Sequence, residues 1–232
     1  MSTAIRYMKV HEKVVRECEA AGRNPEEVTL LAVSKTVDVD QVELAMQAGA
    51  TAFGENRPDE LVRKQKAFPN AQWHFIGNIQ SRHIKDIVSA ATLIHSVCKE
   101  EHLAKIDAAA KSQGKVQRLL LEVNVSGEES KSGFDAEQVK GVIDRAACFE
   151  HIAIEGLMTM APRAQEEAIH STFKGLTQLK EQLNAQLAEE GFSVHLSALS
   201  MGMTEDWPVA IHYGTTIVRI GRAIFSDEFE EA

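Results

Sequence analysis

Cysteine is scarce in this sequence. The 232 residues include three cysteines, Cys18, Cys98 and Cys148, and no two of them form a Cys-x-x-Cys pair. The number is odd and the three are widely spaced, so neither a disulfide framework nor a cysteine-based zinc site is expected. Residues 100–102 read Glu-Glu-His but have no second histidine at helical spacing, and we expect no metal site.

Long apolar runs and an excess of positive charge are also missing. No hydrophobic stretch approaches the roughly 20 residues that span a membrane. Residues 1–21 are charged throughout and lack the apolar core of a signal peptide. The formal net charge of −9 disfavours nucleic acids and anionic membranes as partners, because both bind basic surfaces. We therefore expect a cytoplasmic protein that binds neither.

What the sequence does contain is a regular alternation of strand-like and helix-like segments. Hydrophobic residues make up 44% and charged residues 25%, which is enough for a substantial core. Strands are expected at residues 29–34, 51–54, 73–77, 92–97, 117–124, 151–158, 194–199 and 216–220. Among the expected helices are 5–18, which precedes the first strand, 164–190 and 204–212.

This alternation predicts an α/β fold. We expect one domain over residues 1–232, a closed (β/α)8 barrel of the TIM type with an extra amino-terminal helix. An open doubly wound sheet is the alternative, because the spacing of strands along a chain does not show closure.

The first expected strand ends on a lone lysine. Residues 29–34 form an unbroken run typical of a strand buried on both faces, and Lys35 follows at its carboxyl end. In parallel α/β folds ligands bind at that end. A lysine amine held half out of water is a nucleophile that forms a Schiff base with an aldehyde. Taken alone, this stretch is more often a lysine that ends a strand and reaches for solvent.

Other polar residues at expected strand ends would converge on the same barrel mouth. The mouth would hold Lys35, Asn56, His74, Ser200, Arg219 and Gly221. Barrels often bind phosphate through backbone N–H groups after their last two strands. Glu205 and Asp206 are expected in the first turn of the next helix and would repel phosphate there. Residues 221–222, Gly-Arg, therefore form the better phosphate cradle.

Each of these residues also has a simpler structural interpretation. His74 lies in an apolar strand and is typical of a hydrogen-bonded core histidine, whereas Arg219 can pair with a glutamate inside the barrel. Together, however, a lysine, an arginine and a phosphate cradle at one mouth are what an aldehyde-bearing phosphate cofactor needs.

Motifs along nearly the whole chain resemble the pyridoxal phosphate homeostasis protein family. They comprise residues 32–36, 53–57, 73–77, 123–134, 156–158, 199–203 and 218–221. The resemblance implies a barrel like the amino-terminal domain of alanine racemase. It also implies that the cofactor pyridoxal 5′-phosphate is bound as a Schiff base on Lys35.

The resemblance also implies a set of cofactor-binding residues: Lys35, Asn56, Ser200, Met201, Arg219, Gly221 and Arg222. Arg219 would approach the pyridine nitrogen, Ser200 and Gly221 would hold the phosphate, and Asn56 and Met201 would line the ring. Arg222 stands where the family commonly has a small polar residue, so it either strengthens phosphate binding or points outward. Residues 58–59 and 78–83 also depart from the family pattern.

A carrier is expected rather than an enzyme. Racemisation needs two bases on opposite faces of the substrate carbon, and the two tyrosines, Tyr7 and Tyr213, are expected away from the mouth. An arginine at the pyridine nitrogen would weaken the ring as an electron sink. We therefore predict a monomeric, non-catalytic protein that carries or buffers pyridoxal 5′-phosphate in vitamin B6 and amino-acid homeostasis.

The expected partners are pyridoxal 5′-phosphate, other B6 vitamers and, transiently, apoenzymes that depend on this cofactor. The alternatives are a weak pyridoxal-phosphate-dependent amino-acid racemase and a barrel that binds a different phosphate ligand. A role for Lys131 in cofactor release stays open.

Overall fold

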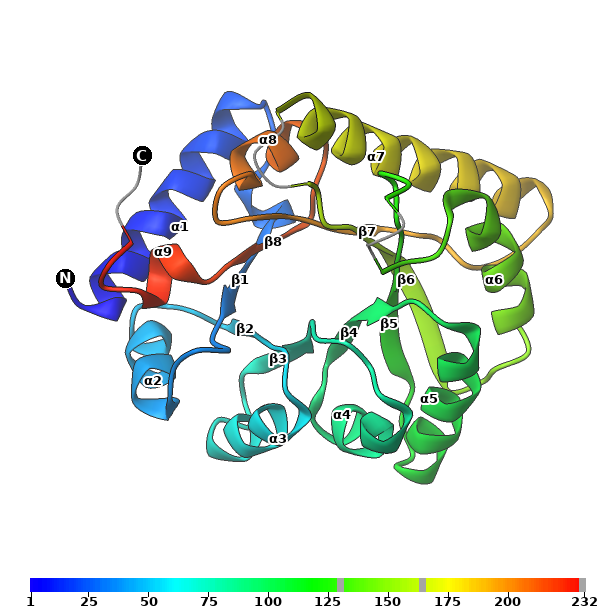
Figure 1. Cartoon of the computed structure of the whole chain (residues 1–232), viewed down its shortest axis with the longest axis horizontal. Helices are drawn as coiled ribbons and strands as arrows, with labels where there is room; N and C mark the ends of the chain where they lie inside the picture. Colours follow the sequence, from blue (N-terminus) through cyan, green and yellow to red (C-terminus); the bar gives the residue numbers. More distant parts are fainter. Residues whose placement is uncertain (129–131, 163–165, 230–232) are drawn as a thin grey trace.

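Eight parallel strands close into a barrel in the computed structural model of the chain, which describes residues 1–128, 132–162 and 166–229 (Figure 1). Each strand pairs with the next along the chain, and β8 closes the barrel by pairing with β1. The strands are β1 Thr29–Val33, β2 Ala52–Glu55, β3 Gln72–Phe75, β4 Leu93–Val97, β5 Gln117–Glu122, β6 Ile152–Met158, β7 Ala198–Met203 and β8 Ile217–Ile220. The expected barrel is therefore confirmed over the open sheet.

Helices surround the strands on the outside of the barrel (Figure 1). They are α1 Thr3–Ala20, α2 Val39–Gln47, α3 Pro58–Ala67, α4 Ile84–Ala90, α5 Glu100–Ser112, α6 Val139–Ala146, α7 Glu166–Glu189, α8 Trp207–His212 and α9 Arg222–Phe225, with short 3-10 turns at Pro25–Glu27, Ser81–His83 and Ala136–Gln138. The extra helix α1 packs against α2, α8 and α9. Among the described residues, no helix combines the length and the apolar character needed to cross a bilayer.

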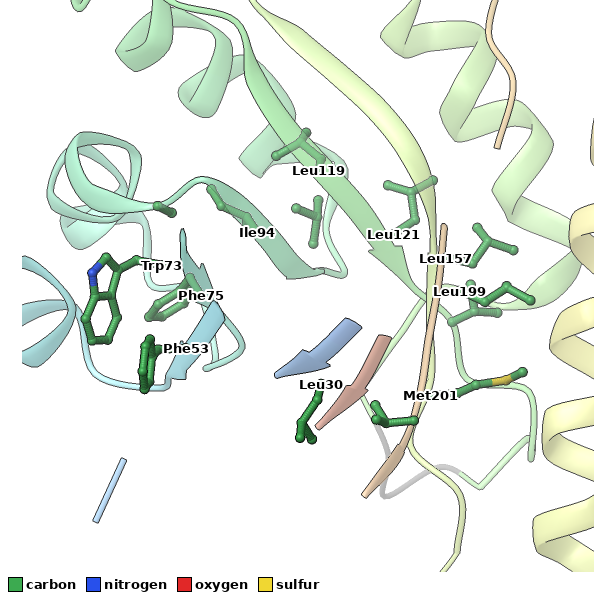
Figure 2. Close-up of a cluster of buried hydrophobic side chains, with 14 of the residues drawn as sticks. Leu30, Phe53, Trp73, Phe75, Ile94, Leu119, Leu121, Leu157, Leu199 and Met201 are labelled. Carbon is green, nitrogen blue, oxygen red and sulfur yellow. The ribbon is translucent and has the colours of Figure 1, made fainter. Parts of the chain in front are cut away.

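The strands are buried on both faces, which explains their nearly continuous apolar sequences. Side chains that point outward pack under the helices, and Figure 2 shows this layer passing from Phe53 and Trp73 to Leu157 and Leu199. Side chains that point inward form a second, smaller cluster that fills the barrel: Leu31, Ala52, Leu93, Leu120, Met158 and Ile217. Because successive strand residues face opposite sides, β1, β2, β4, β5, β6 and β8 each contribute to both layers.

The seventh strand differs most from its expected position. Residues 194–199 were expected to form it, but β7 runs from Ala198 to Met203. The backbone of Leu196 is bonded by the side chain of Asn184 on α7 instead of by a neighbouring strand, at 2.8 Å for its N–H and 2.9 Å for its carbonyl. That side chain satisfies the polar groups of an apolar segment without a strand ladder.

Two helix boundaries differ as well. α8 begins at Trp207 rather than at residue 204, with Asp206 as the residue that precedes it. α7 begins at Glu166 within the described residues, and the expected start at Ala164 lies outside them.

Candidate functional site

A cavity of about 740 Å³ opens at the carboxyl ends of the strands. Its lining includes Lys35 after β1, Asn56 after β2, Gly77 after β3, Met158 at the end of β6 and Arg219 near the end of β8. Parallel strands direct their carboxyl ends to one mouth, so residues far apart in the sequence meet here.

Five of the seven residues predicted to bind the cofactor line this cavity: Lys35, Asn56, Arg219, Gly221 and Arg222. Lys35 is exposed rather than half out of water, because it stands in the turn that follows β1 instead of in the strand. Arg219 is only 5% exposed, so its guanidinium forms part of the cavity floor. Lys131, whose role was left open, lies outside the described residues.

Ser200 and Met201 lie deeper, because β7 extends through both of them. Ser200 is fully buried and bonded to Arg219 inside the barrel. Met201 is the next residue, so its side chain points to the opposite face of the strand. It is buried in the outer layer under the helices, where Figure 2 shows it near Leu199. Neither side chain is part of the cavity lining.

A chain of buried hydrogen bonds crosses the barrel below the cavity. Nδ1 of His74 on β3 is 2.9 Å from Nε2 of His95 on β4. Nδ1 of His95 is 2.8 Å from Oγ of Ser200, and Nη1 of Arg219 donates to that same Oγ at 2.7 Å. Nη2 of Arg219 donates to the carbonyl of Thr159 at 3.0 Å. These hydrogen bonds fix the side chain of Arg219 from inside the barrel and leave its remaining N–H groups for the cavity.

Burial determines the protonation state of the two histidines in this series of hydrogen bonds. It lowers the pKa of His74 to about 4, with a smaller contribution from the charge of Arg118. Burial also holds the pKa of His95 well below its usual value, assisted by the charges of His74 and Arg219. Both imidazoles are therefore neutral at pH 7, and each has one donor and one acceptor nitrogen. His74 was expected at the mouth, and it lies inside the barrel as the hydrogen-bonded core histidine of the alternative interpretation.

Two buried carboxyl groups accompany Arg219. Burial raises the pKa of Glu122, at the end of β5, and the charge of Arg219 opposes that rise. Burial likewise raises the pKa of Asp206, whose carboxylate accepts a hydrogen bond from the backbone N–H of Met203. Burial lowers the pKa of Arg219 to about 10, although Asp206 and Glu122 favour its charged form. The arginine thus stays protonated at neutral pH and is a hydrogen-bond donor.

Close backbone contact holds Asn56 at the mouth. A Cβ atom on Gly77 would lie 2.1 Å from the carbonyl oxygen of Asn56, so only glycine fits at this position. The hydroxyl of Ser96 donates to the carbonyl of Gly77 from the other side. The loops after β2 and β3 are therefore packed together where they line the cavity.

Arg222 at the rim pairs with an acidic residue. Its Nη2 lies 2.5 Å from Oε1 of Glu205, and both side chains are exposed. Glu205 and Asp206 were expected in the first helical turn after β7. Because α8 begins at Trp207, Glu205 lies in the loop facing Arg222, and Asp206 folds back on Met203.

His95, Thr159 and Glu122 were not identified from the sequence as parts of the site, and Asp206 was considered only as a charge that would repel phosphate. For His95 the available signal was a polar side chain inside an otherwise apolar strand, Leu93–Val97, whereas Thr159 and Asp206 lie outside the strands. That signal marks a buried polar group but does not show which partner it meets across the barrel.

Comparison with known proteins places the chain in a family. The model of the alanine racemase N-terminal domain matches residues 14–228. The pyridoxal phosphate homeostasis protein of Aquifex aeolicus is 34% identical over 230 residues, covering 98% of this chain and 99% of the relative. The chain belongs to the pyridoxal phosphate homeostasis protein family. A member from Pseudomonas aeruginosa is 36% identical over 229 residues, covering 97% and 96%. These relatives are named as homeostasis proteins and not as enzymes.

Solved structures agree with this assignment. PipY of Synechococcus elongatus, a structure with PLP bound, is 28% identical with a TM-score of 0.80, covering 92% of this chain and all of PipY. An unknown protein from Bifidobacterium adolescentis is 32% identical with a TM-score of 0.89, covering 96% and 94%. Alanine racemase of Clostridium difficile is 16% identical with a TM-score of 0.71, covering 95% of this chain and 58% of the racemase, and shares the fold.

The buried histidines predict a pH dependence of stability. Below about pH 6.5 the unfolded chain protonates His74, whereas the folded protein resists protonation until about pH 4. The free energy of unfolding should therefore fall as the pH drops through this range, by roughly 2 kcal/mol at pH 5 for a single such histidine. Glu122 and Asp206 act in the opposite sense, so the comparison needs a variant that removes one histidine.

Denaturant unfolding of His74→Gln between pH 7.5 and pH 5 is the measurement. The variant should lose about 2 kcal/mol less than the unmodified protein over this range, because glutamine does not titrate. His195→Gln, at an exposed histidine, is the matched control and should follow the unmodified protein. An unchanged pH dependence in His74→Gln would contradict the assignment.

Proposed function

We propose that this protein binds pyridoxal 5′-phosphate through Lys35 and carries or buffers the cofactor without turning it over. The observation that carries the proposal is that the amine of Lys35 and the guanidinium of Arg219 line one cavity at the barrel mouth. A family relative of the same fold, PipY, has been solved with PLP bound.

The residues of the cavity fit the three chemical parts of this cofactor. It brings an aldehyde that reacts with amines, a pyridine ring and a phosphate group. Lys35 supplies the amine, and Arg219 supplies a fixed donor for the ring nitrogen. Val33, Ile76 and Met158 give the cavity apolar surface suited to a ring.

The phosphate end of the proposed site lies at Gly221 and Arg222. A Cβ atom on Gly221 would lie 3.1 Å from the carbonyl oxygen and 3.3 Å from Cβ of Val33, so a side chain would crowd the approach to this backbone. Arg222 adds a positive charge at the rim. Because Glu205 already forms an ion pair with Arg222, a phosphate would compete with that carboxylate for the guanidinium.

The remaining predicted residues take indirect parts in this proposal. Asn56 borders the cavity beside Gly77 and would contact the ring from its own loop. Ser200 would act through Arg219, because its hydroxyl accepts a hydrogen bond from that side chain. Met201 would support β7 from the helix side, because its side chain is buried in the outer layer.

The attachment at Lys35 would be reversible. Lys35 would hold the aldehyde through its amine as a Schiff base, with the release of one water. Addition of water, or exchange with another amine, would return the free lysine. Because Lys35 is exposed, water and amines reach it without a conformational change.

A committed catalyst would need a second base opposite the lysine, and neither tyrosine supplies one. Tyr7 is buried in α1 within the outer core. The hydroxyl of Tyr213 is 3.0 Å from Nδ1 of His170, and Tyr213 is not in the cavity lining. Arg219 stays protonated, so it would donate a hydrogen bond to the ring nitrogen without protonating it, and the ring would be a weak electron sink.

The proposal also includes the location, oligomeric state and partners of the protein. We infer that the protein acts as a cytoplasmic monomer within vitamin B6 and amino-acid homeostasis. Its partners would be pyridoxal 5′-phosphate, other B6 vitamers and, transiently, the apoenzymes that receive the cofactor.

The absorption spectrum of the protein mixed with pyridoxal 5′-phosphate tests the attachment. An imine band should appear in the unmodified protein and be absent in Lys35→Ala. Borohydride reduction followed by peptide mass spectrometry should place the adduct on Lys35. Lys99→Ala, at another exposed lysine that follows a strand end, is the matched control and should keep the band. A spectrum that does not change on adding the cofactor would contradict the site.

Exchange of the α-proton of amino acids for deuterium separates a carrier from a racemase. With the cofactor loaded, the protein should incorporate deuterium no faster than free pyridoxal 5′-phosphate, because the cavity lacks a tyrosine as second base. NMR of a panel of L-amino acids measures the rate. Incorporation well above the free cofactor, and lost in Lys35→Ala, would favour the racemase alternative.

The ion pair at the rim predicts opposite effects of two substitutions. Glu205→Gln frees Arg222 and should tighten pyridoxal 5′-phosphate binding by up to about fivefold, the upper end for an exposed ion pair, whereas Arg222→Ala should weaken it by a similar factor. Neither should change the affinity for pyridoxal, which lacks the phosphate. Fluorescence titration of both ligands gives the Kd values. Equal effects on both ligands would show that Arg222 does not contact the phosphate.

A further inference from the structure

The turn that carries Lys35 is held from below by a second, buried lysine. Lys64 lies on α3 and is 1% exposed. Its Nζ donates to the carbonyl of Ser34 at 2.9 Å and to the carbonyl of Val37 at 2.7 Å. These two carbonyls flank Lys35 and Thr36 in the sequence, so one ammonium group ties both ends of the turn.

The third hydrogen of the same ammonium group goes to a buried carboxylate. Nζ of Lys64 contacts Oε1 of Glu55, which is 0% exposed at the end of β2. The hydroxyl of Ser34 donates to that same oxygen at 2.9 Å. All three donors of the lysine are thereby used, and the turn is bonded through backbone and side chain alike.

Neighbouring charges reinforce this arrangement. Glu60, one turn earlier on α3, lies 3.9 Å from Nζ of Lys64. Arg63, the residue before Lys64 on that helix, bridges Glu60 and Asp38, which lies just beyond the turn. Helix α3 therefore contacts the segment after β1 at Ser34, Val37 and Asp38.

Stability alone is a poor explanation for the pair. Burying two charges costs more free energy than their attraction returns unless every polar atom is satisfied, and apolar residues of the same size often serve a core equally well. Among the described residues no hydrogen-bond partner reaches Oε2 of Glu55, so the pair is not fully satisfied. What the pair does secure is one conformation of the turn that presents Lys35.

We propose that Lys64 and Glu55 are positioning residues for Lys35. They fix the backbone on both sides of it, so that its amine is presented to the cavity before any ligand arrives. The inference rests on the proposed function, since it assigns the pair a purpose at that site. A turn ordered in advance does not have to be ordered on binding, and affinity gains by that difference.

The double variant Glu55→Gln with Lys64→Met tests the proposal. It removes both charges together, so neither is left alone in the core, and the amide oxygen of the introduced glutamine still offers an acceptor to the hydroxyl of Ser34. Lys66→Met makes the same substitution two residues away on α3, where the side chain is exposed, and serves as the matched control.

Two measurements apply to each protein. Amide hydrogen exchange without cofactor reports on the turn through Val37, whose N–H bonds to the carbonyl of Ser34. Imine absorbance gives the Kd of pyridoxal 5′-phosphate. In the double variant, exchange at Val37 should be at least about tenfold faster and the Kd about tenfold higher, as expected if one more residue must be ordered on binding. Lys66→Met should match the unmodified protein in both.

The outcomes separate a positioning role from a purely structural one. If the double variant melts at a lower temperature but keeps the exchange rate at Val37 and the Kd, the pair only stabilises the barrel and the proposal is overturned. If the unmodified protein forms no adduct on Lys35, the proposed function fails instead, and the exchange data still decide whether Lys64 orders the turn.

If the double variant does not fold, a measurement on the unmodified protein still tests the proposal. The amides of Val37 and Gly127 each make a single hydrogen bond of 3.1 Å in a turn after a strand, but the turn at Gly127 has no lysine beneath it among the described residues. Val37 should exchange at least about a hundredfold more slowly than Gly127, because its turn opens only with α3. Equal exchange rates would overturn the proposal.

Discussion

The protonated guanidinium of Arg219 is the constraint on which the rest of the site depends. A buried charge is tolerated only where hydrogen bonds and opposite charges replace the water it has lost. Ser200 and Thr159 accept from this side chain, and Glu122 and Asp206 favour its charge. The cavity floor is consequently a fixed hydrogen-bond donor.

Lys64, Arg219 and Lys35 have different roles at this mouth. Lys64 uses all its donors on Ser34, Val37 and Glu55, so it orders backbone and offers nothing to a ligand. Among the described residues, Arg219 uses two of its nitrogens within the barrel, and it also lines the cavity. Lys35 is exposed, as an amine that must be reached by an aldehyde has to be. Lys64 and Arg219 thus make the site rigid, whereas Lys35 provides the amine that a ligand can reach.

The sequence predicted a parallel α/β fold because strands that are apolar on both faces, separated by helices, are a local signature. Closure has no such signature, and the pairing of β8 with β1 shows it in the structure. Strand ends likewise placed Lys35, Asn56, Arg219, Gly221 and Arg222 on one cavity. It could not locate β7, because the backbone of Leu196 is satisfied by a distant side chain, Asn184. Lys64 was missed for a similar reason: a lysine on an amphipathic helix is typical of the solvent face, and only the tertiary structure brings Glu55 beneath it.

The same geometry bears on whether such a site holds its ligand or transforms it. A catalyst must bind the transition state more tightly than the ground state, which requires groups that engage only as the reaction proceeds. The groups that shape this mouth are fixed before a ligand arrives: Arg219 by Ser200, and the turn of Lys35 by Lys64. Groups fixed in advance stabilise a transition state only where they face the charge that develops in it. The proposed role in storage and transfer therefore rests on the positions of Tyr7 and Tyr213 away from the cavity, and on an exposed amine from which water can release the aldehyde.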